Sequence, residues 1–253
     1  MSERYYISEQ KELLAQGKAV LTGAESLHLT RVMRQKPGDE VLLFDGSGRE
    51  FRGVIDAVGR DRVELTLIET REATACTGPE LTMAVALPKG ERQKWLVEKL
   101  TELGVHRYIP LRVERQDVKF DANVGKRLER QVIEASKQCG RLRLMEIGPE
   151  MSRREIVDWL PKEEQVDLLK ILSHPISDGA FGQFSFAQFM ERFTASGLFP
   201  RRILIAIGPV GGLTHAEVQE AVDDQWDTLD LGEQVYRVET AAIVAASLFL
   251  HMN

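Results

Sequence analysis

Short hydrophobic runs alternate with polar residues and glycine-rich turns in the first quarter of the chain. Asp45-Gly46-Ser47-Gly48 and Gly59-Arg60-Asp61 are turn sequences whose glycines allow positive φ. Before them, residues 24–34 have the spacing of a short helix with Leu27 and Leu29 on its apolar side. Short strands this close together predict a small β-barrel that ends near residue 72. The predicted strands are 41–44, 51–58 and 63–67.

The pattern changes after residue 80, where buried-type strands alternate with amphipathic helices. Such alternation predicts an α/β domain with a mainly parallel sheet covered on both faces. We therefore predict an N-terminal domain at 1–72, a linker at 73–80 and a C-terminal domain at 81–253. The predicted strands are 81–87, 108–111, 166–172, 202–207 and 226–231. The predicted helices are 91–103, 122–139, 185–194, 214–224 and 241–251.

The last predicted helix, 241–251, is apolar on every side, with Ser247 as its single polar residue before His251. A helix of this kind has to be buried all round. In a domain of this size, that requirement indicates a central position or a subunit interface, and we expect both.

The composition describes an ordinary globular protein of 253 residues with a net charge of −6. No apolar run is long enough for a membrane span, and no signal peptide precedes the first strand. Cys76 and Cys139 are the two cysteines, and the histidines lack metal-ligand spacing. We therefore expect a cytoplasmic protein with no metal and no membrane contact.

The middle of the chain is basic although the whole chain is acidic. Residues 89–143 carry 14 basic and 8 acidic side chains. A local positive patch can hold phosphates whatever the global charge. The alternative is an ordinary solvated helix face. The candidate phosphate-binding residues are Arg127, Arg130, Lys137 and Arg141, together with Arg31, Arg34 and Lys36.

Glycine-bearing loops follow the strands at 202–207 and 226–231, and His174 follows the strand at 166–172. The carboxyl ends of parallel strands meet at one edge of the sheet, where ligands of α/β domains bind. Gly208-Pro209-Val210-Gly211-Gly212 matches neither the dinucleotide fingerprint nor the phosphate-binding P-loop. A tight strand-to-helix turn is the alternative interpretation of this segment.

Several motifs in order along nearly the whole chain resemble the RsmE-type ribosomal RNA methyltransferases. This family belongs to the SPOUT class of S-adenosylmethionine-dependent enzymes. The motifs are His28-Leu29-Thr30-Arg31-Val32-Met33-Arg34, Lys36-Pro37-Gly38-Asp39, Phe44-Asp45-Gly46-Ser47-Gly48, Lys99-Leu100-Thr101-Glu102-Leu103-Gly104-Val105, Glu134-Ala135-Ser136-Lys137-Gln138-Cys139-Gly140-Arg141, Ile207-Gly208-Pro209-Val210-Gly211-Gly212, Leu231-Gly232 and Arg237-Val238-Glu239-Thr240-Ala241.

The resemblance implies a PUA-like N-terminal β-barrel that helps to hold RNA, and a C-terminal SPOUT domain with a trefoil knot. It implies a homodimer, formed through the C-terminal domain, that methylates N3 of a uridine in 16S ribosomal RNA of the small ribosomal subunit. It also implies that three loops bind S-adenosyl-L-methionine. The matching residues are Leu172, Ser173, His174, Ile207, Gly208, Pro209, Gly211, Gly212, Leu231, Gly232, Val235, Tyr236, Arg237 and Thr240.

The chain departs from the family pattern at four places. Val210 stands where the family usually has glutamate, and Tyr236 where it usually has leucine. Lys137 replaces a common acidic residue, and Leu144-Met145 stands where a proline is common. Val210 matters most, because it removes a carboxylate from a predicted cofactor loop.

Arg237 is our first hypothesis for a catalytic residue, because a cation near O2 or O4 of uracil favours loss of the N3 proton. Arg141, from the partner subunit, is the second. Glu239 is expected to orient Arg237, with a structural ion pair or a helix-start carboxylate as its alternatives. The rival functions are a noncatalytic RNA-binding protein of SPOUT fold, a SPOUT methyltransferase for another RNA, and an α/β enzyme acting on a free nucleotide.

Overall fold

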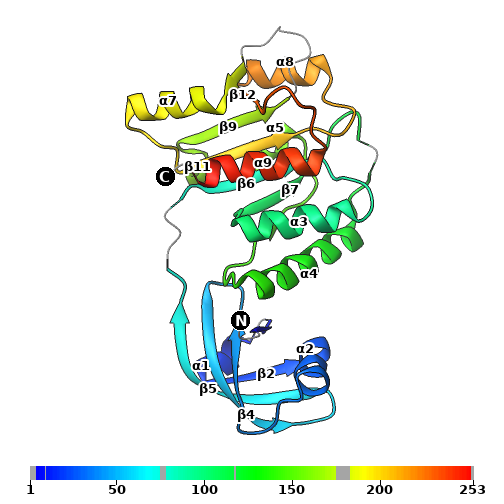
Figure 1. Cartoon of the computed structure of the whole chain (residues 1–253), viewed down its shortest axis with the longest axis vertical. Coiled ribbons are helices and arrows are strands. Elements are labelled where there is room, and N and C mark those ends of the chain that lie inside the picture. The colour runs from blue at the N-terminus through cyan, green and yellow to red at the C-terminus, as the bar shows by residue number, and fades with distance from the viewer. Residues whose placement is uncertain (1–3, 9, 75–77, 117, 175–182, 252–253) are drawn as a thin grey trace. The chain divides into compact units, whose positions relative to one another are not determined.

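The computed structural model describes residues 4–8, 10–74, 78–116, 118–174 and 183–251 (Figure 1). Its contacts divide the chain into two compact units. The N-terminal unit comprises Met1–Ala75 and Ile133–Leu144, and the C-terminal unit comprises Cys76–Val132 and Met145–Asn253. The predicted linker at 73–80 lies partly outside the described residues.

The N-terminal unit contains a five-stranded sheet of order β1-β3-β4-β5-β2. Neighbouring strands are antiparallel, except that β1 pairs in parallel with β3. Alternate residues of these strands, such as Leu43, Ile55 and Leu65, form its hydrophobic core. The three predicted strands are confirmed, whereas β1 and β2 were not predicted. The strands are β1 (Arg4–Tyr6), β2 (Lys18–Thr22), β3 (Glu40–Phe44), β4 (Arg49–Val58) and β5 (Arg62–Glu72).

The single helix predicted at 24–34 is wrong in detail. The segment forms a short helix α2 (Gly23–Leu27) that continues as a π-helical turn η1 (His28–Val32). The Thr30 hydroxyl donates to the Ser26 carbonyl at 2.9 Å, a side-chain bond that competes with regular helix geometry. Arg34 then adopts a left-handed backbone with φ of 56°, which ends the helix. Helix α1 (Lys11–Ala15) completes this part of the unit.

The C-terminal unit contains a seven-stranded sheet of order β10-β12-β9-β11-β6-β7-β8. Every pairing in it is parallel, as predicted. The short strands β8 and β10 were not predicted. The strands are β6 (Glu80–Val85), β7 (Arg107–Pro110), β8 (Glu146–Ile147), β9 (Leu168–Ser173), β10 (Gln183–Ser185), β11 (Arg202–Ile207) and β12 (Asp227–Asp230).

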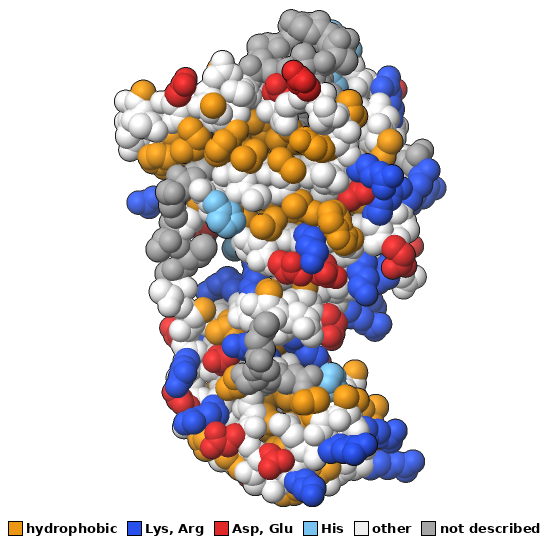
Figure 2. Space-filling model, viewed as in Figure 1, with side chains coloured by type: hydrophobic (Ala, Val, Ile, Leu, Met, Phe, Trp, Pro, Cys, Tyr) orange, Lys and Arg blue, Asp and Glu red, His pale blue; other side chains and the backbone are white. Residues whose placement is uncertain are grey.

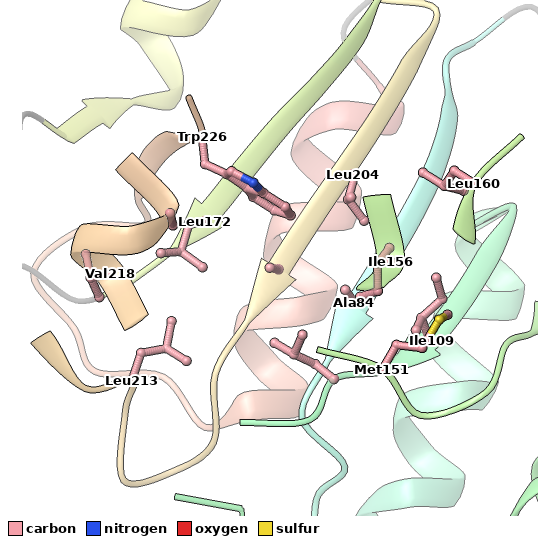
Figure 3. Packing of buried hydrophobic residues seen from close by; sticks show 13 residues of the cluster. Ala84, Ile109, Met151, Ile156, Leu160, Leu172, Leu204, Leu213, Val218 and Trp226 are labelled. Carbon is pink, nitrogen blue, oxygen red and sulfur yellow. The ribbon is translucent and has the colours of Figure 1, made fainter. Parts of the chain in front are cut away.

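Helices cover both faces of this sheet, which confirms the predicted α/β arrangement. Helices α3 (Arg92–Leu103) and α9 (Val238–Leu250) lie side by side over one face (Figure 1). Helices α5 (Arg153–Trp159) and α8 (His215–Asp223) pack on the other face. Figure 3 shows Leu172 of β9, Val218 of α8 and Leu213 of the loop before α8 in the core of that second face. The remaining helices are α4 (Ala122–Cys139), α6 (Lys162–Gln165) and α7 (Phe186–Ser196).

Helix α9 begins at Val238, three residues before the predicted start. Small residues on one side allow close packing, and Ala242, Ala245 and Ala246 are fully buried. Ile243 and Val244, on the opposite side, are only half-buried. The expected central position is therefore confirmed, and one apolar stripe remains accessible. Among the described residues, no helix is both long and apolar enough to span a bilayer.

Candidate functional site

Three neighbouring strands of the C-terminal unit end at the same level. Ser173 of β9 pairs with Ile207 of β11 on one side and with Leu229 near the end of β12 on the other. Because all three strands run in parallel, the loops that follow them emerge at one edge of the sheet. This register brings together the three loops that the sequence analysis had selected.

A pocket lies between these loops, and every residue that lines it belongs to the C-terminal unit. Its lining is mostly apolar or backbone, as expected of a small-molecule site. The lining residues are Ser173, His174, Ile207, Gly208, Pro209, Val210, Gly212, Leu213, Asp230, Leu231, Gly232, Gln234, Val235, Tyr236, Val238 and Ala241.

The loop after β11 is shaped by glycine geometry. A Cβ on Gly208 would meet Cγ of Leu213 at 2.8 Å, so only glycine lets this buried leucine sit against the backbone. Gly212 has a left-handed φ of 69°, which closes the turn. The loop then enters α8 through a capping box, in which the Thr214 hydroxyl accepts from the backbone N–H of Glu217.

Glu217 ties this loop to a neighbouring segment. Its carboxylate accepts the backbone N–H of Thr214 at 2.7 Å and the backbone N–H of Glu114 at 3.0 Å. Burial raises the pKa of Glu217, but these hydrogen bonds outweigh burial and hold the pKa below its ordinary value. Arg115 also donates to the Gly211 carbonyl at 2.9 Å. The glycine loop is therefore held from outside the pocket.

The last residue of β12 contributes the single Asp, Glu, Lys or Arg side chain among the described lining residues. This residue is Asp230, whose carboxylate accepts the backbone N–H of Gly232 at 2.8 Å. Gly232 has a left-handed φ of 106° that suits the turn. A lone carboxylate gives the pocket a negative character, which favours a cationic ligand over an anionic one.

Most of the residues predicted to bind the cofactor line this pocket, but four do not. Leu172 points to the other face of the sheet and packs in the core of the second face (Figure 3). The Gly211 carbonyl is engaged by Arg115, and Thr240 lies half-buried on α9. Arg237 lies between the lining residues Tyr236 and Val238 without lining the pocket itself.

Arg237 occupies the N-cap position of α9 and is exposed. It forms no ion pair with any described residue, and its neighbours in sequence on both sides line the pocket. The expectation that Glu239 orients it is wrong. Glu239 is buried, and its nearest cation is Arg92 of α3, at 3.7 Å. Glu239 lies two residues along the helix from the N-cap, roughly half a turn, and its carboxylate is turned toward Arg92 of α3 instead.

The basic residues predicted on and just after α4 differ in their contacts and exposure. Arg127 donates to the Gln93 side chain, and Arg130 is exposed. Lys137 is largely buried and paired with Glu25 at 2.9 Å, so it is not an open phosphate contact. Arg141 donates to the Arg143 carbonyl at 2.6 Å. Arg127 and Arg130 belong to the C-terminal unit, whereas Lys137 and Arg141 belong to the N-terminal unit.

Arg31, Arg34 and Lys36 are exposed. None of them forms an ion pair with a described residue, in contrast to Arg4 and Arg52 of the same unit. Unpaired cations on one segment are the usual footprint of phosphate binding.

Six lining residues were not predicted to bind the cofactor. One of them, Asp230, could have been predicted from the sequence. Asp230 places a carboxylate at the end of the buried strand β12, directly before Leu231-Gly232. The others have the sequence character of packing or turn residues. The six are Val210, Leu213, Asp230, Gln234, Val238 and Ala241. In the described part of the chain, no group of His, Cys, Asp or Glu could hold a metal ion.

Comparison with known families accounts for both units. Residues 76–250 match the family profile described as an RNA methyltransferase domain. Residues 21–68 match the profile described as an RNA methyltransferase PUA domain. The first match alone covers more than half of the chain, and the N-terminal unit is PUA-like.

Individual relatives extend over nearly the full length. The chain is 28% identical to ribosomal RNA small subunit methyltransferase E of Bacillus subtilis, over 97% of this chain and 94% of the relative. The corresponding protein of Rickettsia conorii is 29% identical over 96% and 92%. A Legionella pneumophila methyltransferase solved in complex with S-adenosylmethionine superposes with a TM-score of 0.80 at 26% identity, covering 98% and 97%.

Proposed function

The chain belongs to the RNA methyltransferase family, and on that premise we propose that it methylates N3 of a uridine in 16S ribosomal RNA with S-adenosyl-L-methionine. The observation that carries the proposal is the pocket formed by three strand-end loops. It lies in a chain similar over almost its whole length to a methyltransferase solved with that cofactor.

The chemistry of the pocket suits this methyl donor. The apolar lining accepts an adenine ring, and the open space beside Gly212 leaves room for hydrogen bonds to main-chain atoms. Asp230 supplies the negative charge that a sulfonium or an α-ammonium group requires. When bound, S-adenosyl-L-methionine supplies the activated methyl group, so that no metal is needed.

Arg237 is the residue we assign to the reacting base. Uridine N3–H has to lose its proton before the nitrogen attacks the methyl group, and charge then develops on O2 and O4. An unpaired guanidinium at the pocket mouth stabilises that charge. Holding the base in line with the methyl group supplies up to ~7–11 kcal/mol of the rate enhancement. Because N3 is masked in a base pair, the uridine has to be unpaired or flipped out.

RNA is held through the PUA-like unit and through α4. Arg31, Arg34 and Lys36 offer unpaired cations in the first, and Arg130 offers an exposed one in the second. Arg141, proposed to act from the partner subunit, is the second catalytic residue. We also propose that the chain forms a homodimer through its C-terminal domain and that this domain contains a trefoil knot. The proposed site of action is the cytoplasm, where ribosomes assemble.

Replacing Arg237 by alanine tests the catalytic assignment. We expect S-adenosyl-L-methionine to bind with near-normal affinity in calorimetry, because Arg237 does not line the pocket. Methyl transfer to 16S RNA should fall about 100-fold or more, since a preorganised charge-stabilising group is lost. Arg201→Ala, an exposed arginine on the loop before β11, is the control. Unchanged turnover in Arg237→Ala would remove Arg237 from the mechanism.

The function as a whole is tested by incubating the protein with 16S ribosomal RNA and labelled cofactor, followed by mass mapping of the RNA. One methylated uridine is expected.

Val210 favours one alternative, a noncatalytic RNA-binding protein, because it leaves the cofactor loop without the family's carboxylate and is 76% exposed. Absence of binding heat at millimolar cofactor would support that alternative.

A further inference from the structure

A second pocket lies wholly within the N-terminal unit, and the proposed reaction gives it no role. Its volume of about 680 Å³ falls in the roughly 300–1,000 Å³ range of pockets that hold small molecules. His28 and Met33 supply one side, and Gln35 supplies an amide. The cations Arg4, Arg52 and Lys137 also line it.

The charges inside this pocket are already compensated. Each lining cation has a carboxylate partner, and Glu40 and Glu134 add further negative charge to the lining. A phosphate entering the pocket would compete with carboxylates that lie at hydrogen-bond distance. The interior therefore suits a neutral polar ligand. The pairs are Arg4–Glu50 at 2.8 Å, Arg52–Glu69 at 3.0 Å and Lys137–Glu25 at 2.9 Å.

The Gln35 side chain leaves one buried acceptor unmet. Its Oε1 atom is inaccessible to solvent and has no donor in the described structure. A buried polar atom without a partner is costly, and turning the Gln35 amide oxygen toward a ligand that donates an N–H would remove the cost. The imino and amino groups of nucleobases are such donors. His28 and Met33 offer a ring and a thioether against which a flat base can pack.

Between residues 33 and 36, side chains that line the pocket alternate with side chains that do not. Met33 and Gln35 line the pocket, whereas Arg34 between them and Lys36 after them do not. Arg34 holds a left-handed φ of 56°, a conformation that costs energy in a residue with a side chain and that clusters at functional sites. Together with Arg31, these unpaired cations lie on the same segment as the pocket residues.

We infer that this pocket receives one unstacked base of the RNA, while Arg31, Arg34 and Lys36 hold the adjoining phosphates. This base differs from the uridine that is methylated, which reacts at the C-terminal pocket. The PUA-like unit then selects the substrate by one base as well as by charge. The inference rests on the proposed function for the identity of the polymer.

Binding of full-length protein to a 16S ribosomal RNA transcript tests the inference through Gln35→Leu. We expect about tenfold weaker binding, equivalent to ~1.4 kcal/mol. The slope of log Kd against log salt should stay unchanged, because no phosphate contact is lost. Arg34→Ala should instead reduce the slope. Gln16→Leu, an exposed glutamine of the same unit outside the pocket, is the control. Equal affinities for Gln35→Leu and Gln16→Leu would overturn the inference.

A crosslinking measurement separates this inference from the catalytic proposal. A benzophenone side chain in place of Met33 should crosslink to one unpaired nucleotide, whereas the same group in place of Val32, which is 66% exposed and outside the pocket, should crosslink diffusely. Identical patterns, or no crosslink at Met33, would refute the base pocket. If the Met33 crosslink forms but no methyl group is transferred, the enzyme assignment fails and the base pocket stands.

Discussion

Gly208 shows how one residue type sets the geometry of the cofactor pocket. Its backbone lies against Leu213, whose side chain is both part of the core and part of the pocket wall. The space that a Cβ would need is already filled by Cγ of Leu213, which is not the free end of a side chain. The motif therefore requires glycine here for packing rather than for φ.

Gly208→Ala should force Leu213 out of place and reshape the pocket. We expect the free energy of unfolding to fall by roughly 1–3 kcal/mol, which is the typical cost of overpacking a core. Binding of S-adenosyl-L-methionine should weaken about tenfold, a change of ~1.4 kcal/mol. Gly211→Ala is the matched control, since its Cβ would meet nothing closer than Arg115 at 3.7 Å. Calorimetry and thermal unfolding measure both effects, and equal behaviour of the two variants would contradict this account.

The capping box of α8 links helix formation to the placement of the glycine loop. Glu217 satisfies the N–H of Thr214 and the N–H of Glu114, which lies far away in sequence. One carboxylate therefore fixes both the helix start and the segment behind the loop. Its pKa is lowered because these hydrogen bonds favour the charged form more than burial disfavours it.

This linkage predicts a pH dependence with a definite sign. A carboxylate whose folded pKa lies below its ordinary value stabilises the protein above that ordinary value, and the contribution is lost as pH falls through the folded pKa. Glu217→Gln should thus cost about 1 kcal/mol at neutral pH, and the difference from wild type should vanish in acid. Denaturant unfolding at several pH values measures this, with Glu191→Gln on α7 as an exposed control. A difference that stays constant with pH would count against the role of Glu217.

Most elements that the sequence predicted have a periodicity that runs for at least four residues, although the five-residue strand β2 was missed. Helix α4 begins and ends where its apolar spacing places it, and the five predicted strands of the C-terminal sheet are all present. Strands β1, β8 and β10 have two or three residues, too few for a pattern to show. Helix α5 has a capping box between Ser152 and Glu155, a sequence signal that went unread.

The sequence predicted which loops form the candidate site, because this follows from the order of strands along the chain. It did not predict which side chains of those loops face the pocket. Parallel strands with glycine-bearing ends had to place their loops at one edge, so the loops could be chosen in advance. Which residue faces inward depends on register, and a shift of one residue reverses the face. Leu172 and Ser173 illustrate this, because the first packs in the core and the second lines the pocket.

Helix α9 connects the fold of one chain to its proposed assembly. Its buried side packs on the sheet and on α3, while Ile243 and Val244 on the other side are half-buried. Trp95 on α3 is 43% exposed. Figure 2 shows hydrophobic side chains gathered over α9 and α3 on this face of the C-terminal unit. Contiguous apolar surface of this kind marks an interaction site, and a second copy of the chain is the occupant that the dimer proposal supplies.

Ile243→Glu should therefore convert the dimer to a monomer. In a two-fold symmetric interface the added charge occurs twice, and each copy would be removed from water without a partner. Sedimentation velocity should show a single species near 28.5 kDa, whereas the proposed wild-type dimer should sediment at twice that mass. Val166→Glu, on an apolar residue of the C-terminal unit that is 61% exposed and thus more accessible than Ile243, should leave the dimer intact. If Ile243→Glu stays dimeric with unchanged circular dichroism, α9 is not the interface.

If Arg141 acts across the interface, the monomer should also lose methyl transfer while still binding S-adenosyl-L-methionine.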